Sequence, residues 1–526
     1  MWIPNPHRHP ILNKSRQVLL NPPLQHHPSS HTHTHPPHPP PWPPTAPAPA
    51  LSPPDDHPSS PPPPSSLSAL LGSLRRSALS THNRLASILA DADFVQRAAS
   101  SLRRPLVANQ RCGAWYLPPG AARASAYFKS TDGHERAWKF STRRLNLHLV
   151  DLAEQHDGLI VVDSTRRGKR MPDALAATVP IWCAVLNQVL LPAHPLSAQL
   201  FLPPHLLATT HDQIAALIPS FVAALRDLRL PSLPTSLTKP LRPLWITPSS
   251  ALPPCSPSSS APIFRDYRPV ICLTASRRVP HGADPRDGYV QGAADDTENW
   301  AHGLTPALFW AHADLLLRTD EPLLPDLIAR LVRQDQLARQ EQAHDAGSRV
   351  PLAPCLSVCC LPLAAPGGSP DGSPDGCPDG SAAADCHVAL TADAPTPSAT
   401  WVKSRNYMQV ALGRSKTASR NLRLALPDIC RFVAAFFERS GGPPPEQCRL
   451  VVACDSGRDI SVGTALALLC YLFDERGVFR APDGNAVFTK TLVKTRLGSI
   501  MTAYPAANPS RQTLQSVNSF LMDWTR

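Results

Sequence analysis

Residues 451–461 have the sequence VVACDSGRDIS, and the apolar run Val462–Phe473 follows them directly. This pattern predicts a buried strand, a tight loop that contains a glycine, and then a helix. In such an arrangement the backbone N–H groups and the helix N-terminus direct positive charge toward one point. The segment therefore predicts a phosphate-binding loop, formed by Cys454, Ser456, Gly457, Arg458, Asp459 and Ser461.

The loop resembles that of the cysteine-dependent phosphatases, in which an arginine occupies the sixth position after the cysteine. Here the sixth residue after Cys454 is Ile460, and Ala453 stands where those enzymes usually have histidine. The missing guanidinium is the group that stabilises a phosphoryl transition state. We therefore expect the loop to bind phosphate without phosphatase chemistry.

Composition limits the architecture. The 526 residues leave room for two or three domains. Of the 63 prolines, 22 lie in the first 64 residues, so a disordered low-complexity tail is predicted over residues 1–66. Residues 366–385 contain tandem Pro-Asp-Gly turns and are predicted to link an α/β domain over 67–365 to a second over 386–526. The predicted fold class is therefore mixed α/β.

Charge and cysteine content limit the function. The formal net charge of +11 favours polyanionic partners such as nucleic acid. The 13 cysteines include no Cys-x-x-Cys pair, which argues against zinc fingers and a secreted disulfide framework. No apolar run is long enough to span a membrane. These features predict a reducing compartment, the cytoplasm or the nucleus.

Local patterns predict the elements of the first domain. Helices are expected over residues 67–102, 174–191, 210–228 and 308–342, and a buried strand over Gly158–Val162. In the second domain an amphipathic helix is expected near residues 428–438 and a terminal helix over 511–524.

Three polar blocks of the first domain are candidate site segments. The first block spans residues 127–148. Its candidates for binding the phosphorylated ligand are Lys129, Ser130, Thr131, Arg143 and Arg144, and its candidate catalytic residues are Asp132 and His134. The second follows the predicted strand and supplies Asp163, Arg166, Arg167, Lys169 and Arg170. A strand that leads into a polar, glycine-containing loop is where α/β folds bind phosphorylated ligands.

The third block contains Asp295 and Asp296, whose carboxylates suit a hard cation such as Mg²⁺. Asp295 and Asp296 could equally cap a helix, and Arg143 and Arg144 could be surface cations. From these patterns alone, the chain is predicted to bind a phosphorylated ligand and a polyanion.

Together the blocks resemble the initiator-tRNA phosphoribosyltransferase family, the tRNA adenosine-64 2′-O-ribosylphosphate transferases. The similar segments cover about residues 80–526 apart from the linkers, and Ala294 stands where the family is expected to have glycine. They are 128–134 with 140–149, 158–187 (including IVVDSTRRGKRMPDAL), 289–310 (YVQGAADDTENWAHGLTPALFW), the Cys454 loop and 501–522 (MTAYPAANPSRQTLQSVNSFLM).

The resemblance implies a dual-specificity-phosphatase-like second domain. It also implies transfer of ribose 5-phosphate from phosphoribosyl pyrophosphate to the 2′-hydroxyl of adenosine-64, in the T stem of initiator methionine tRNA. That modification would mark the tRNA for initiation and exclude it from elongation. No membrane and no obligate protein partner are implied. The competing hypothesis is an inactive phosphatase-like module that binds a phosphorylated ligand or RNA.

The implied chemistry assigns roles to the candidate residues. Mg²⁺, held by Asp295 and Asp296, and the cations of the second block would stabilise the leaving pyrophosphate. Asp163, Asp132 or His134 could act as general base. The sugar donor could lie wholly in the first domain, or its phosphate could occupy the Cys454 loop. A basic stripe is expected to contact the tRNA: Lys403, Arg405, Arg414, Lys416, Arg420 and Arg423.

Overall fold

The structure is a computed structural model, and its described residues are organised around two five-stranded sheets. The described residues are 78–130, 137–166, 168–230, 233–253, 262–284, 286–342, 349–363, 385–439, 449–474, 476–481 and 488–523. The predicted tail over 1–66 lies outside them, as does the predicted linker over 366–385 except for Asp385.

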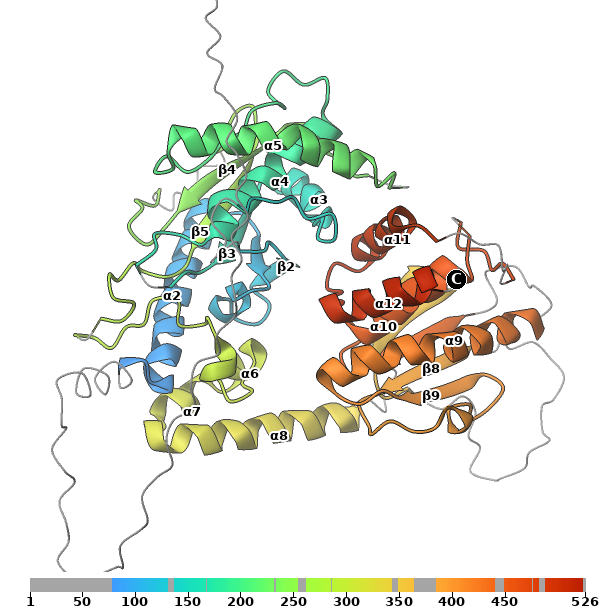
Figure 1. Cartoon of the computed structure of the whole chain (residues 1–526). Coiled ribbons are helices and arrows are strands. Elements are labelled where there is room, and N and C mark those ends of the chain that lie inside the picture. The colour runs from blue at the N-terminus through green and yellow to red at the C-terminus, as the bar shows by residue number, and fades with distance from the viewer. Residues whose placement is uncertain are drawn as a thin grey trace, which may run out of the picture. The chain divides into compact units, whose positions relative to one another are not determined.

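The first sheet has five parallel strands in the order β2-β1-β3-β5-β4 (Figure 1). Each residue of β3 is buried, as expected for a parallel strand that helices cover on both faces. This strand matches the one predicted over Gly158–Val162. The strands are β1 Leu106–Asn109, β2 Ala122–Ala126, β3 Leu159–Asp163, β4 Leu241–Ile246 and β5 Arg268–Thr274.

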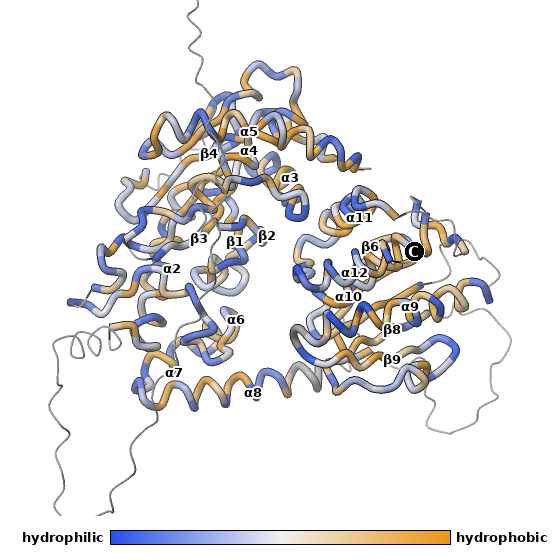
Figure 2. Tube along the Cα trace, viewed as in Figure 1, coloured by the Kyte–Doolittle hydropathy of each residue, from blue (hydrophilic) through white to orange (hydrophobic). Residues whose placement is uncertain are grey.

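Alternate side chains of these strands enter two separate cores, because successive residues of a strand face opposite sides of the sheet. Ile160 and Val162 pack with α2 (Thr81–Leu102), α6 (Pro306–Ala311), α7 (Ala313–Arg318) and α8 (Leu324–Gln342). Leu159 and Val161 pack with α3 (His148–Gln155), α4 (Val179–Leu190) and α5 (Ala208–Arg226). In Figure 2 apolar and polar residues alternate along α8, as they do in a helix with one buried face.

Three predicted helices of this domain differ from the observed ones. The helix predicted over 67–102 is observed as α2, which begins at Thr81 because the Ser80 side chain caps it there. The single helix predicted over 308–342 is instead α6, α7 and α8, with a 3-10 turn over Glu321–Leu323. Pro322 in this turn lacks the N–H that a continuous helix would need. The helix predicted over 174–191 begins with a π-helical turn, Ala174–Thr178, ahead of Pro180 in α4. Further 3-10 turns span Gly113–Tyr116, Thr297–Asn299 and Ser398–Thr400.

The second sheet has the order β6-β7-β10-β8-β9; among the described strands β6 is antiparallel to β7 and the other neighbours are parallel. It begins at β6, upstream of the boundary predicted at residue 366, so the Pro-Asp-Gly segment falls between two strands of one sheet. The short β6 and β7 gave too weak a pattern to be recognised ahead of so strong a turn signal. The strands are β6 Val350–Ala353, β7 Leu356–Cys360, β8 Cys386–Thr391, β9 Tyr407–Ala411 and β10 Leu450–Cys454.

The described residues of the second domain also form the helices α9 Ser415–Arg439, α10 Ile460–Tyr471, α11 Lys490–Ala503 and α12 Arg511–Asp523. The strand-loop-helix predicted at Cys454 is present as β10 and α10. Helix α9 starts well before the predicted residue 428 and continues through Pro427. No helix in the described ranges is long and apolar enough to span a membrane.

Candidate active site

The first candidate site lies at the carboxyl edge of the first sheet, where β1 and β3 end side by side. The chain continues from β1 to β2 on one side and reaches β3 on the other, so the connection changes direction between these strands. Open α/β sheets bind ligands at this switch point. Asn109 is the last residue of β1 and Asp163 the last of β3.

Asp163 is completely buried, and hydrogen-bond donors surround its carboxylate. Its Oδ2 accepts from Asn109 Nδ2 at 2.8 Å, and its Oδ1 accepts from the Ser164 N–H and from Cys112 Sγ, both at 2.8 Å. Burial, with the Asp163 charge beside it, raises the pKa of Cys112 well above its usual value, so this thiol stays protonated. The Asp163 carboxylate therefore fixes the positions of Asn109, Cys112 and the Ser164 N–H relative to one another.

Arg111 connects two buried carboxylates. Its Nη1 lies 2.9 Å from Asp295 Oδ1, and its Nε lies 3.6 Å from Asp163 Oδ2. Its Nη2 also donates to the Ser164 carbonyl at 2.5 Å. Since burying a charge without a partner is costly, this guanidinium allows two acidic groups to share one interior.

The second polar block is anchored to the third. Gln291 Oε1 accepts from the Gly168 N–H at 2.9 Å, and its Nε2 donates to the Lys169 carbonyl at 2.8 Å. At Gly292, where φ is +67°, a Cβ would come within 2.8 Å of the Thr165 carbonyl oxygen. Only glycine allows this approach without a shift. These contacts hold Thr165, Gly168 and Lys169, which follow β3, against the third block.

Both predicted metal ligands are paired with arginines: Asp295 with Arg111 and Asp296 with Arg166. Among the described residues, no three His, Cys, Asp or Glu side chains gather in a way that would hold a metal ion. The other carboxylate oxygen of Asp295, Oδ2, is buried and has no hydrogen-bond partner within the described ranges. The residues therefore do not fit a metal centre built by the protein alone.

The raised pKa of Asp295 predicts how the stability of the folded chain changes with pH. Burial raises its pKa to about 6 from an ordinary 3.8; Arg111 opposes this shift and Asp163 adds to it. The folded chain therefore holds the proton more tightly than the unfolded chain, and stability falls as pH rises from about 4 to 6. We expect the difference in unfolding free energy, wild type minus Asp295→Asn, to fall by about 2 kcal/mol between pH 4 and 7. Urea unfolding across that range measures it, and a flat difference would contradict the assignment.

The second candidate site is the Cys454 loop. Cys454 Sγ donates to Ser461 Oγ at 3.1 Å, and the Gly457 N–H donates to the Cys454 carbonyl at 3.1 Å. Gly457 has φ of +62°, and a Cβ there would approach the Cys359 carbonyl carbon within 2.9 Å. Ile460, at the position of the phosphatase arginine, begins α10 and packs against the apolar core. The loop keeps the shape of a cradle without a guanidinium at that position.

Two predicted members of the loop make structural contacts. Asp459 Oδ1 accepts from the Ser510 N–H at 2.8 Å and from Thr513 Oγ1 at 2.7 Å, which ties the loop to the start of α12. The Arg458 carbonyl accepts from the Asn508 N–H at 2.7 Å, while the Arg458 side chain is exposed. Ser456 is exposed, with its Oγ 3.7 Å from Cys454 Sγ.

Arg144 connects the first polar block to this loop. Its guanidinium donates to the Ala507 carbonyl and to Asn508 Oδ1, and it stacks over Tyr127 with 4.7 Å to the ring centroid. Because Asn508 also contacts Arg458, one residue separates a first-domain arginine from the Cys454 loop. Burial lowers the pKa of Arg144. Neighbouring Arg143 is exposed.

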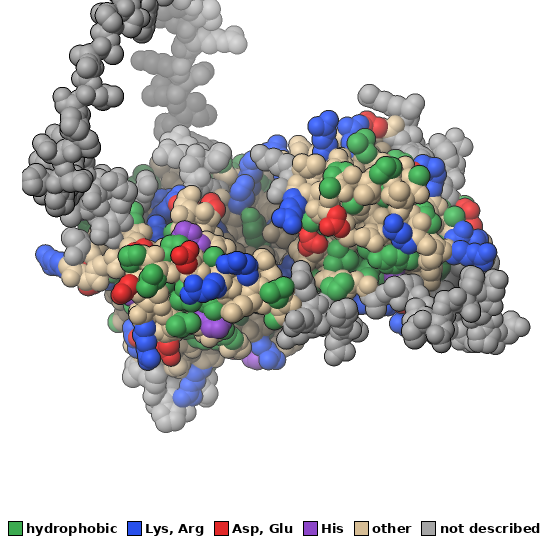
Figure 3. Space-filling view, turned by 90° about the horizontal axis from the view of Figure 1, so that it is seen from below, with side chains coloured by type: hydrophobic (Ala, Val, Ile, Leu, Met, Phe, Trp, Pro, Cys, Tyr) green, Lys and Arg blue, Asp and Glu red, His purple; other side chains and the backbone are tan. Residues whose placement is uncertain are grey.

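The remaining predicted residues are dispersed. Lys129, Lys169 and Arg170 are exposed, and Ser130 is half-buried; Thr131, Asp132, His134 and Arg167 lie outside the described residues. Of the predicted tRNA stripe, Lys403, Arg405, Arg414, Arg420 and Arg423 are exposed, and the Lys416 side chain is not described. Arg423 pairs with Asp523. On the face shown in Figure 3, Lys and Arg side chains form separate small groups among apolar and acidic ones.

Sequence reasoning missed Asn109, Arg111 and Cys112, which surround Asp163. Asn109 ends a strand of only four residues, and Arg111 and Cys112 come after it; the strand is too short for a recognisable alternation. The signal that could have found them is the change from the apolar Leu106–Ala108 to the polar Asn109–Arg111 ahead of Gly113. Gly113 also packs tightly, since a Cβ there would lie 2.2 Å from the Val162 carbonyl oxygen.

Comparison with known proteins identifies the family. Residues 74–333 match the model of the Rit1 N-terminal domain, and residues 406–521 match that of the Rit1 DUSP-like domain. The tRNA A64-2′-O-ribosylphosphate transferase of Saccharomyces cerevisiae is 32% identical over 496 residues, which cover 87% of this chain and 95% of that protein. This chain belongs to the Rit1 family.

Other similar proteins add little about activity. An uncharacterized protein of Schizosaccharomyces pombe is 44% identical over 261 residues, 48% of this chain and 56% of that protein. The crystal structure of human DUSP28 matches with 15% identity and a TM-score of 0.20, over 33% of this chain and 92% of that one. The DUSP-like assignment therefore rests on the Rit1 family model, and it agrees with the Cys454 loop.

Proposed function

We propose that this chain is a pentosyltransferase that modifies tRNA. It transfers ribose 5-phosphate from phosphoribosyl pyrophosphate to the 2′-hydroxyl of adenosine-64 of initiator methionine tRNA, which marks the tRNA for initiation and excludes it from elongation. The observation that carries the proposal is the similarity to the S. cerevisiae tRNA A64-2′-O-ribosylphosphate transferase along nearly its whole length. The polar site at the switch point of the first sheet supports it.

The proposed reaction makes one bond and breaks one. The 2′-oxygen of the tRNA bonds to the anomeric carbon of the sugar donor, the bond from that carbon to pyrophosphate breaks, and the hydroxyl proton passes to a base. The transition state resembles an oxocarbenium ion, as in other glycosyl transfers. The site must therefore stabilise pyrophosphate and accept a proton.

The cationic loop after β3 is the proposed pyrophosphate site. Lys169 and Arg170 are exposed there, and Arg166 is half-buried beside Asp296. Guanidinium and ammonium groups at a strand end can stabilise the developing charge of the leaving group. We propose that Mg²⁺ would arrive with the sugar donor, where it would supply further positive charge to the leaving group.

Asp163 is proposed as a positioning residue. Both its carboxylate oxygens already accept hydrogen bonds, and it is completely buried. It contacts Asn109 and Arg111 at the carboxyl edge of the sheet and immediately precedes the cationic segment in the chain. The base is then proposed to come from the first polar block, where Asp132 and His134 are the candidates.

Transfer of label tests the function directly. Phosphoribosyl pyrophosphate labelled in its 5-phosphate is incubated with the full chain and an initiator tRNA transcript. The proposal expects stable label on the tRNA. A matched transcript with 2′-O-methyladenosine at position 64 lacks the nucleophile and should take none. Absence of label from the unmodified transcript would leave the competing function, a phosphatase-like binding module, as the better one.

Cys454→Ser is expected to retain transfer activity within about threefold of wild type. The serine hydroxyl can make the same hydrogen bond to Ser461 Oγ, and without an arginine at Ile460 the loop is not equipped for covalent phosphoryl chemistry. Steady-state transfer assays measure this. Gly457→Ala is the control that disturbs the loop itself, because its Cβ would clash at Cys359. A loss of 100-fold or more in a folded Cys454→Ser variant would indicate a chemical role for the thiol.

A further inference from the structure

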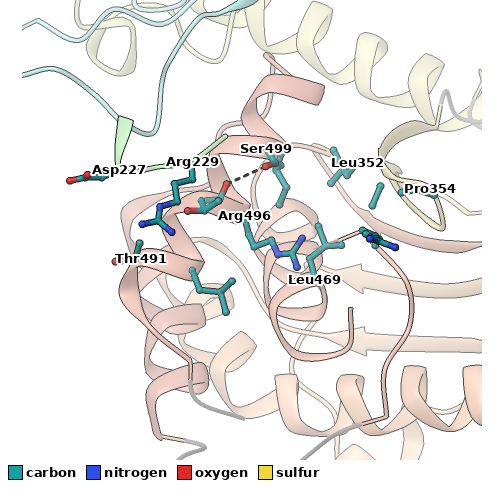
Figure 4. A pocket seen from close by; sticks show the side chains of 14 residues that line it. Asp227, Arg229, Leu352, Pro354, Leu469, Thr491, Arg496 and Ser499 are labelled. Carbon is teal, nitrogen blue, oxygen red and sulfur yellow. Dashed lines mark hydrogen bonds between the residues drawn. The ribbon is translucent and has the colours of Figure 1, made fainter. Parts of the chain in front are cut away.

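Helix α11 borders a hollow that none of the candidate residues above explains. Its volume is about 840 Å³, and it is lined by the segment after α5, by helix α11, by the end of β6 with the turn after it, and by Arg476 and Gly477 beyond α10. Figure 4 shows Asp227 and Arg229 from the first of these, Arg496 and Ser499 from α11, and Leu352 and Pro354 from the third. The hollow is large enough to admit several atoms of a polymer backbone beyond a single phosphate.

Most of the charged side chains that line this hollow are basic. Arg229, Arg476 and Arg496 line it, and Asp227 is the single carboxylate among the described lining residues. Arg229 and Arg476 are exposed, and no ion pair joins either side chain to a carboxylate within the described part of the chain. Three cations with one carboxylate leave the hollow with a net positive charge, which attracts an anion.

The opposite side of α11 repeats the pattern. A smaller hollow of about 210 Å³ is lined by Arg143, Lys490 and Lys494, and no described carboxylate lines it. Both lysines are exposed. Helix α11 carries Lys490, Lys494 and Arg496 without a single acidic residue. Basic groups therefore flank this helix on two sides, which suits a chain of phosphates better than one isolated anion.

Specific packing holds α11 against the first domain. Thr495 Oγ1 donates to the Leu228 carbonyl at 3.0 Å, and a Cβ at Gly498 would come within 3.0 Å of Leu230 Cδ2. Between these two contacts lies Arg229, whose φ of +43° is a conformation that costs a non-glycine residue free energy. The strained turn presents the guanidinium of Arg229 to the hollow.

We propose that the two hollows along α11 bind the sugar-phosphate backbone of the tRNA, which rests on tRNA being the acceptor of this enzyme. The surface is formed by Arg229, Arg476, Arg496, Lys490, Lys494 and Arg143. It differs from the stripe of basic residues between Lys403 and Arg423. Contact through phosphates is expected to give affinity with little sequence preference, since an A-form stem is bound largely through its backbone and shape.

The double variant Arg229→Gln/Arg476→Gln of the full chain tests the proposal. Binding of an initiator tRNA transcript is measured by filter retention between 50 and 300 mM salt. We expect affinity to fall about tenfold near 100 mM salt and the slope of log affinity against log salt to decrease by about two, one per lost phosphate contact. The control is Arg318→Gln/Arg330→Gln, which removes the same charge from exposed positions on α7 and α8.

Three measurements separate the outcomes. An effect on tRNA binding no larger than that of the control would overturn the proposal. A loss of affinity for phosphoribosyl pyrophosphate alone, measured by calorimetry without tRNA, would also overturn it and assign the hollow to the sugar donor. Label transfer by the wild-type chain is assayed in parallel, so a failure of the transferase function is seen independently of a failure of this binding surface.

Discussion

Asp163→Asn is expected to reduce transfer activity by at least 100-fold and the free energy of unfolding by about 3 kcal/mol. The substitution preserves shape, so the effect arises from charge and hydrogen bonding. The native carboxylate accepts from Asn109, Cys112 and the Ser164 N–H, and it faces Arg111. The oxygen of an asparagine amide can accept from the donors at one of the two carboxylate positions. Its NH₂ group then occupies the other position, where it faces donors and can accept no hydrogen bond.

Activity should fall because Arg111 and Asn109 lose their common anchor. If Asp163 positions the site, kcat falls while the KM for tRNA stays within about threefold, since the α11 surface and the basic stripe are untouched. Assays at 15 °C, well below the unfolding transition, separate this effect from loss of folded protein. Urea denaturation measures the change in the free energy of unfolding.

Asp157→Asn is the matched control. Asp157 is another carboxylate of the first domain with arginine partners, Arg104 and Arg268, but its side chain is 31% exposed. Solvent compensates for much of a lost ion pair at such a position, so a change of about 1 kcal/mol or less is expected, with near-normal activity. Equal effects of Asp163→Asn and Asp157→Asn on activity and stability would contradict the role that we assign to the buried carboxylate of Asp163.

Local sequence patterns predicted the parts of the molecule that depend on neighbouring residues. The Cys454 loop was found because strand, glycine turn and helix are consecutive, and Asp163 because a run of β-branched residues ends at it. The cations after Asp163 and the carboxylates at Asp295 and Asp296 were named from composition and from resemblance to the family. In each case the signal lies within about a dozen residues.

The contacts that build the site could not be predicted in this way. Asn109 is 54 residues from Asp163 along the chain, and their contact depends on β1 pairing with β3 in parallel. Arg111 reaches Asp295 across an even longer separation, and that ion pair changes the interpretation of a proposed metal ligand. The same limit applies to β7, which pairs with β10 although the Pro-Asp-Gly segment lies between them. Pairing between distant segments decides these features, and local patterns do not encode it.

Arg111→Met is expected to destabilise the chain by about 3–5 kcal/mol at pH 7.5, because it leaves Asp163 and Asp295 as two buried carboxylates without their shared cation. The loss should be smaller at pH 5.5. Arg111 lowers the pKa of Asp295, so its removal raises that pKa above about 6, and the carboxyl takes up a proton as pH falls. Protonation removes one of the two uncompensated charges.

The double variant Arg111→Met/Asp295→Asn tests this explanation by removing the same charge through mutation. It should be more stable than Arg111→Met at pH 7.5 and should lose most of the pH dependence between 5.5 and 7.5, both measured by urea unfolding. If Arg111 contributed only packing, the double variant would be no more stable than the single one.

Arg268→Met is the control because Arg268 also joins two carboxylates, Glu154 and Asp157. Hydrogen bonding to Arg268 lowers the pKa of Glu154 to about 2, and its removal returns that pKa toward the ordinary 4.5. Any recovery by protonation then occurs below pH 5.5, so the cost of Arg268→Met should be flat between pH 5.5 and 7.5. The two arginines differ because Asp295 is buried and has a raised pKa in the wild-type chain, whereas Glu154 has a lowered one. Of the two substitutions, Arg111→Met is therefore the one that raises the pKa of a carboxyl toward neutral pH.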